Sequence, residues 1–124
     1  MQSDKAPQMT YVNLGNSGLK VSKIGFCNLG NWWMFGEEGE DLQAQVNSLV
    51  KTAWEAGINL YDTSEYYGMG KAEKQLGTAL KLLQVPRSDY VVTTKIFFGH
   101  DPKINHLRAN NIGTSRKRII EGLN

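Results

Sequence analysis

The chain has 124 residues, of which 40% are hydrophobic and 21% are charged, and its formal net charge is +2. This composition is typical of one globular domain, and the small net charge gives no basis for binding nucleic acid or an anionic membrane. The single cysteine, Cys27, excludes an intrachain disulfide, and no apolar run reaches the roughly 18 residues of a membrane helix, so we expect a cytoplasmic protein without direct membrane insertion.

The spacing of apolar residues predicts a hairpin followed by alternating strands and helices. Residues 1–9 are polar and carry no apolar signal segment, so we expect a flexible leader there. The turn composition Gly15-Asn16-Ser17-Gly18 predicts the hairpin, and apolar residues at helical spacing predict the helices. The expected strands are 11–14, 19–24, 24–29, 58–61 and 90–95, the expected helices are 41–56, 71–83 and 116–123, and the expected loops are 30–40 and 96–113.

This order of elements bears on the fold class, because strands that alternate with helices form parallel sheets with right-handed crossovers. Two architectures share the order: the open doubly wound sheet and the (β/α)8 barrel. Residues 25–30 lack the GxGxxG pattern of a nucleotide-binding doubly wound sheet, and polar candidate residues directly follow strands, where barrel enzymes carry their chemistry. We therefore expect an α/β fold in which an N-terminal β-hairpin precedes about three βα units of an incomplete TIM-type barrel.

Three residues near strand ends are candidates for a proton-transfer site. Asp62 follows the strand expected at 58–61, Lys95 ends the strand expected at 90–95, and Tyr67 lies between them in the chain. A free tyrosine has a pKa of about 10, and a nearby ammonium such as that of Lys95 would lower it. Asp62 would hold Lys95 charged and oriented. The structural alternatives are a rim aromatic for Tyr67, a solvated strand end for Lys95 and a turn cap for Asp62.

The remaining candidates have plain structural interpretations. Trp32 and Trp33 would either wall a pocket for a flat ring or pack beneath their loop. The two histidines lack a further ligand at metal spacing, so we expect no metal site. The basic cluster Ser115-Arg116-Lys117-Arg118 could bind phosphate, but we expect a solvated helix face, where positive charge in the first turn opposes the helix dipole. Cys27 is expected to be a buried apolar residue.

Several ordered motifs resemble one known family. GINLYDTSEYYGMGKAEKQLG, followed by TTKIFFG, resembles the aldo-keto reductases. LGNSGLKVSKIG near the start and TSRKRIIEGLN at the end are similar to the branch that contains voltage-gated potassium channel β subunits and their NADPH-dependent reductase relatives. The resemblance extends over about residues 9–124, and its motifs are correctly ordered and spaced.

The resemblance implies a (β/α)8 barrel that binds NADPH without a Rossmann motif and reduces small aldehydes and ketones to alcohols. It implies that Tyr67 is the acid, that Lys95 lowers the pKa of this tyrosine, and that Asp62 is the partner of the lysine. Trp32 and Asn31 match positions beside the nicotinamide, where Asn31 replaces the usual threonine, and Asp62 belongs to the same cofactor-binding set.

The main departure from the family is length, because a complete barrel needs roughly 250 residues. We expect residues 10–124 to be the N-terminal part of an aldo-keto reductase barrel and this chain alone to be inactive. The alternative from another class is a non-catalytic cytosolic binding module similar to a potassium channel β subunit. Its expected partner is a voltage-gated potassium channel or a full-length homologue. A degenerate fragment is the third interpretation.

Overall fold

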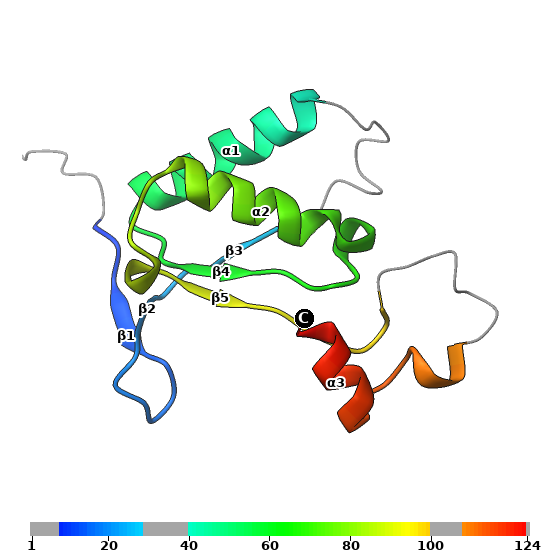
Figure 1. Cartoon of the computed structure of the whole chain (residues 1–124). Helices are drawn as coiled ribbons and strands as arrows, with labels where there is room; N and C mark the ends of the chain where they lie inside the picture. The colour runs from blue at the N-terminus through cyan, green and yellow to red at the C-terminus, as the bar shows by residue number, and fades with distance from the viewer. Residues whose placement is uncertain (1–7, 29–39, 100–107, 124) are drawn as a thin grey trace, which may run out of the picture.

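The computed structural model describes residues 8–28, 40–99 and 108–123. It contains a two-stranded antiparallel hairpin, a three-stranded parallel sheet and three α-helices (Figure 1). The strands are β1 (Tyr11–Asn13), β2 (Lys20–Ser22), β3 (Phe26–Cys27), β4 (Leu60–Asp62) and β5 (Val91–Thr93); the α-helices are α1 (Glu40–Glu55), α2 (Lys71–Leu82) and α3 (Arg116–Gly122); and the 3-10 helices are Tyr67–Gly70, Arg87–Asp89 and Arg108–Asn110.

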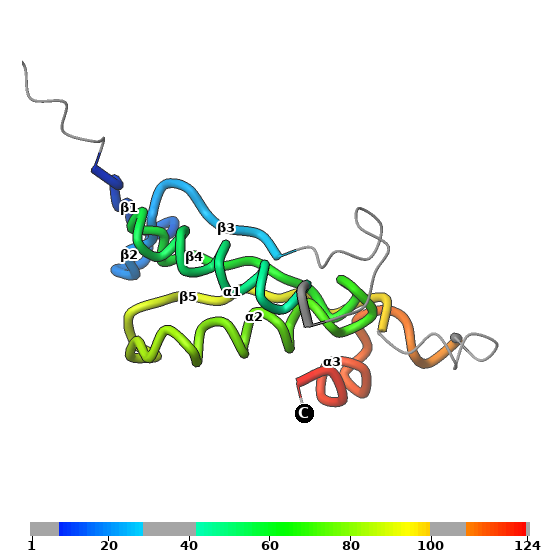
Figure 2. Tube along the Cα trace, turned by 90° about the horizontal axis from the view of Figure 1, so that it is seen from above, coloured from blue at the N-terminus to red at the C-terminus, as the bar shows by residue number. Residues whose placement is uncertain are grey.

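The parallel sheet has the strand order β3-β4-β5. Helices α1 and α2 lie together on one face of this sheet (Figure 1). The hairpin lies at one end of the sheet and α3 at the other, and the view from above in Figure 2 shows the same arrangement. Among the described residues β5 pairs with β4 alone, so one edge of the sheet carries unpaired backbone groups.

The core lies between the parallel sheet and the two helices. Tyr61 is fully buried at the centre of β4, and its strand neighbours Phe26 and Val92 pack against the same cluster. The two helices contribute apolar residues at helical spacing, which explains why each buries one face. These residues are Val46, Val50 and Ala53 of α1, and Leu76, Ala79 and Leu80 of α2.

Gly57 ends the first helix and begins the connection to β4. Its φ of 88° lies in the left-handed region, where a residue with a Cβ is strained. Its carbonyl oxygen accepts a hydrogen bond from the hydroxyl of Tyr11 at 2.7 Å. The glycine therefore stops α1 and links it to the hairpin.

Asn59 connects the hairpin to the parallel sheet. Its side-chain oxygen accepts from the backbone N–H of Ser22 at 2.7 Å, and its side-chain nitrogen donates to the carbonyl oxygen of Lys20 at 3.1 Å. Its own carbonyl oxygen accepts from the N–H of Val91 at 2.8 Å. The side chain of Asn59 is thus hydrogen-bonded to β2 of the hairpin, while its backbone is hydrogen-bonded to β5 of the parallel sheet.

The sequence predicted this architecture, and the hairpin, the three parallel strands and the three helices are confirmed. The strands are shorter than expected, and the loop expected at 96–113 contains the 3-10 helix Arg108–Asn110. Residues 1–7 of the expected leader and residues 30–39 of the expected loop lie outside the described residues. Within the described ranges, every helix falls short of the length and apolarity needed to cross a membrane.

Candidate functional site

The candidate site begins with a row of side chains across the parallel sheet. The strand register aligns Cys27, Asp62 and Thr93 on β3, β4 and β5. Neighbouring residues of a strand point to opposite faces, and the preceding row, which includes Tyr61, packs against the helices. The row of Asp62 therefore lies on the sheet face opposite α1 and α2.

Asp62 and Lys95 form a short ion pair on this face. The Nζ atom of Lys95 lies 2.6 Å from Oδ2 of Asp62 and donates a second hydrogen bond to the carbonyl oxygen of Thr63 at 2.8 Å. The hydroxyl of Thr93 donates to the other carboxylate oxygen, Oδ1, at 2.6 Å. Both oxygens of the carboxylate are thus hydrogen-bonded from β5 and its extension.

Tyr67 completes this group of candidates. Its backbone N–H donates to the carbonyl oxygen of Ser64 at 3.1 Å, which turns the chain sharply after β4. Gly68, Met69 and Gly70 then have positive φ values of 57°, 55° and 83° before α2 begins. The turn places the ring centroid of Tyr67 5.0 Å from the Nζ atom of Lys95.

The contacts within the group shift the pKa values of its charged members. Burial favours the neutral amine of Lys95, but the hydrogen bond and the charge of Asp62, and then Tyr67, outweigh burial and raise the pKa of this lysine. Burial likewise raises the pKa of Asp62, but the hydrogen bonds from Lys95 and Thr93 lower it by more. The side chains of Lys95 and Asp62 are 50% and 35% exposed, so solvent screens much of this interaction.

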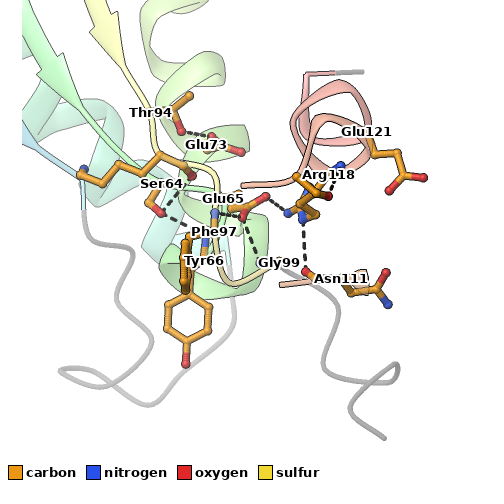
Figure 3. A network of polar contacts seen from close by, with 12 residues as sticks. Ser64, Glu65, Tyr66, Glu73, Thr94, Phe97, Gly99, Asn111, Arg118 and Glu121 are labelled. Atoms are coloured by element: carbon orange, nitrogen blue, oxygen red, sulfur yellow. Dashed lines mark hydrogen bonds and ion pairs between the residues drawn. The ribbon is translucent and has the colours of Figure 1, made fainter. Parts of the chain in front are cut away.

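A second polar network, which the sequence analysis did not identify, surrounds Glu65. Oε1 of Glu65 accepts from the backbone N–H groups of Phe97 at 2.7 Å and Gly99 at 2.9 Å (Figure 3). Its other oxygen pairs with the guanidinium of Arg118, whose Nε donates to the carbonyl oxygen of Asn111 at 3.2 Å. This network joins the segment after β4, the segment after β5 and helix α3.

The position of Arg118 corrects an expectation from the sequence. The basic cluster at 115–118 was predicted to form a solvated helix face, but Arg118 is only 6% exposed. Its pairing with the buried Glu65 is the physical reason, because a buried guanidinium requires a hydrogen-bonded anion. Arg116 and Lys117 of the same turn are exposed, as predicted, and nothing in the sequence distinguished Arg118 from them.

Cys27 also differs from its prediction. It was expected to be a buried apolar residue, but it is exposed, and its Sγ atom lies 3.6 Å from Oδ2 of Asp62. The reason is the register, which places Cys27 on the sheet face without helices. The residues predicted to lie beside the nicotinamide, Trp32 and Asn31, lie outside the described residues, as does Trp33.

Metal binding has no support in the described part of the chain. Residues 8–28, 40–99 and 108–123 contain no group of three or more His, Cys, Asp or Glu side chains that could hold an ion. Both histidines, His100 and His106, lie outside these ranges.

The fold and the site together define a portion of an α/β barrel with polar residues at the carboxyl ends of its strands. A model of the Aldo/keto reductase family matches residues 26–124, and the chain belongs to this family. Over 111 residues the chain is 50% identical to a Schizosaccharomyces pombe protein named "Putative voltage-gated potassium channel subunit beta". This match covers 90% of the chain but only 30% of the length of that relative.

A solved structure is similar to this fold. It is the crystal structure described as "the putative aldo-keto reductase" from Pseudomonas aeruginosa, with a TM-score of 0.67 and 23% sequence identity. The similarity covers 99% of this chain and 44% of the solved chain. At this level of identity the comparison supports the fold, an incomplete TIM-type barrel with an N-terminal hairpin.

Proposed function

We propose that Asp62, Tyr67 and Lys95 are the proton-donating part of a site that reduces small aldehydes and ketones with NADPH. The observation that carries the proposal is the position of the Lys95 ammonium, 2.6 Å from the Asp62 carboxylate and 5.0 Å from the ring centroid of Tyr67. Asp62 is the last residue of β4, Lys95 follows β5 by two residues, and Tyr67 lies in the turn after β4, so all three are near the carboxyl ends of adjacent parallel strands, where barrel enzymes carry their active sites. Membership of the aldo/keto reductase family supports the same reaction.

The chemistry of these side chains fits the reacting end of a nicotinamide cofactor. The Asp62–Lys95 pair lies on the sheet face that α1 and α2 leave open, and the phenol of Tyr67 lies beside its ammonium. When bound, NADPH supplies the hydride that reduces the carbonyl carbon. We propose that Asp62, with Trp32 and Asn31 by family resemblance, holds the nicotinamide end.

Each residue has a distinct role in the proposed reaction. Lys95 has three N–H donors, of which Asp62 and the carbonyl of Thr63 occupy two, so one remains for the neighbouring phenol. Asp62 keeps the ammonium charged and oriented. Tyr67 donates its phenolic proton to the carbonyl oxygen as charge develops there, which yields the alcohol.

A chimera tests this proposal with the chain in a complete barrel. The chain replaces its aligned segment in the Schizosaccharomyces pombe relative, and the loss of NADPH absorbance is followed with 4-nitrobenzaldehyde. We expect Tyr67→Phe to lower kcat by about 100-fold or more, because general acid catalysis contributes about 10²–10⁴-fold. Tyr66→Phe is the matched control, since Tyr66 is exposed and packs on Phe98.

Two results would contradict the proposed function. One is a folded chimera that binds NADPH but does not reduce the aldehyde, and the other is a Tyr67→Phe variant as active as Tyr66→Phe. We also propose that the 124-residue chain alone is inactive, because the three parallel strands that the structure describes leave the side chains of Lys95 and Asp62 50% and 35% exposed to water. Tyrosine-dependent turnover by the chain itself would contradict this second statement.

A non-catalytic binding module is the second candidate function. The observation that favours it is the 50% identity to a relative named as a potassium channel β subunit. We propose, on this alternative, a cytoplasmic subunit whose partner is a voltage-gated potassium channel or a full-length homologue. Pull-down of a channel cytosolic domain by the chimera, unaffected by Tyr67→Phe, would support it, whereas retained catalysis without pull-down would support the enzyme.

A further inference from the structure

Thr93 occupies a defined position beside the proposed active site. It lies directly opposite Asp62 in the register of β4 and β5, and its hydroxyl donates to Oδ1 of the carboxylate at 2.6 Å. Lys95, two residues further along the same chain segment, bonds the other oxygen, Oδ2, also at 2.6 Å. The carboxylate is therefore held between two donors that emerge from one strand and its extension.

The next residue in the chain, Thr94, has the same side chain but a different environment. Its hydroxyl bonds to the carboxylate of Glu73 on α2, which lies on the helix-covered face of the sheet. Alternation along the strand thus directs two consecutive threonine hydroxyls to opposite faces. One reaches Asp62 and the other does not, so the pair provides a built-in comparison.

We propose that Thr93 is a positioning residue, which fixes the Asp62 carboxylate so that its Oδ2 atom holds the Lys95 ammonium beside Tyr67. A carboxylate with one free oxygen can rotate about its terminal bond and lose the geometry of its second partner. The hydroxyl of Thr93 opposes this rotation because it binds Oδ1 on the side away from Lys95. The catalytic consequence rests on the proposed function, whereas the positioning of Asp62 does not.

The groups that face Asp62 are consistent with this role. They are the thiol of Cys27 from β3, the hydroxyl of Thr93 from β5, and the ammonium of Lys95, with Tyr67 beyond the ammonium. Thr93 is among the partners that lower the pKa of Asp62, after Lys95. Removal of its hydroxyl should therefore raise the pKa of this carboxyl, because a hydrogen bond to the charged form is lost.

The test combines two independent measurements: the titration of the Asp62 carboxyl and the kinetics of the chimera. In the 124-residue chain, the carboxyl carbon of Asp62 is titrated by NMR, with Asp62→Asn to assign its resonance. Thr93→Val should raise the pKa of Asp62, whereas Thr93→Ser, which keeps the hydroxyl, and Thr94→Val should not. In the chimera, Thr93→Val should lower kcat about tenfold with little change in KM, as expected for one hydrogen bond to a charged group, and Thr93→Ser should restore it.

The outcomes separate this proposal from the proposed function. A shifted Asp62 titration supports positioning by Thr93, even where the wild-type chimera is inactive and the reaction itself is refuted. An unchanged titration in Thr93→Val would overturn the proposal, whatever happens to the activity. Equal changes in the pKa of Asp62 in Thr93→Val and Thr94→Val would also overturn it, because Thr94 makes its hydrogen bond to Glu73 and not to Asp62.

Discussion

Glu65 and Arg118 are 53 positions apart in the chain, and their side chains form an ion pair that is almost fully buried. Glu65 follows β4 two residues before Tyr67, and its backbone N–H donates to the carbonyl oxygen of Lys95 at 3.3 Å. The pair therefore connects α3 to the two segments that carry the proposed catalytic residues. We therefore expect the Glu65–Arg118 ion pair to contribute to the free energy of unfolding of this part of the fold.

Removal of Arg118 should destabilise the fold substantially. Arg118→Met leaves the Glu65 carboxylate buried with two backbone donors and no counter-charge, so the free energy of unfolding should fall by about 3 kcal/mol. Lys117→Met is the control, since Lys117 and Glu121 form an exposed helical pair worth about 0.3–0.5 kcal/mol. Urea denaturation measures the free energy of unfolding of both variants. Equal decreases in Arg118→Met and Lys117→Met would contradict a larger contribution from the buried pair than from the exposed one.

The same pair should make stability depend on acid. Burial raises the pKa of Glu65, but the backbone donors of Gly99 and Phe97 and the charge of Arg118 outweigh burial and lower it below its ordinary value of 4.5. A lowered pKa contributes stability that is complete above pH 4.5 and is lost as the pH falls through the folded-state value.

The comparison of the wild type with Glu65→Gln isolates this contribution. At pH 7 the variant should be less stable by about 3 kcal/mol, because the buried guanidinium of Arg118 loses its counter-charge. The difference should narrow as urea midpoints are measured at successively lower pH below 4.5. Glu55→Gln, in an exposed helical pair, should differ from the wild type by less than about 0.5 kcal/mol throughout. A Glu65→Gln difference independent of pH would contradict the assignment.

Two glycine substitutions should act in opposite directions. Gly57 has a φ of 88°, and a Cβ at this position would lie 2.8 Å from the Cβ of Met9, so Gly57→Ala should cost more than about 1 kcal/mol. Gly77 lies within α2 with nothing within 4 Å of an added Cβ, so Gly77→Ala should stabilise by about 0.5–1 kcal/mol. Thermal unfolding of both variants checks the signs, and destabilisation by Gly77→Ala would show that α2 packs differently.

Cys27 should react slowly with alkylating reagents although it is exposed. Partial desolvation by neighbouring atoms raises the pKa of its thiol, and the charge and hydrogen bond of Asp62 raise it further, against the opposing effect of Lys95. Asp62→Asn should therefore accelerate alkylation by iodoacetamide at pH 8 severalfold, because more of the thiol becomes thiolate. Asp89→Asn, at the opposite end of β5, is the control and should leave the rate unchanged. Equal alkylation rates in the wild type and both variants would contradict an effect of Asp62 on the pKa of the Cys27 thiol.

Most of the fold was predictable from local patterns. Helical spacing of apolar residues located α1 and α2, and turn composition located the hairpin, since both signals depend on neighbours in the chain. The positions of Asp62 and Lys95 after successive strands also predicted their proximity, because parallel strands end at one edge. Their catalytic roles, with that of Tyr67, stay predictions.

The surroundings of the site were not predictable in the same way. Cys27 lies on the open face only because β3 pairs with β4 in one particular register, and a shift by one residue would reverse its direction. Glu65 lies within the motif GINLYDTSEYYGMGKAEKQLG, but nothing in that motif assigned it a partner. Its burial depends on Arg118, which reaches it from a helix far along the chain.

The sequence alone determined the type and order of the elements, the family to which the chain belongs, and the candidate residues Asp62, Tyr67 and Lys95. The tertiary structure decided which groups surround them: the hydroxyl of Thr93 on the carboxylate and the Glu65–Arg118 pair beside the turn. The physical reason is range. Periodicity and turn chemistry act between near neighbours, whereas strand register and the pairing of buried charges are set only when distant segments pack together.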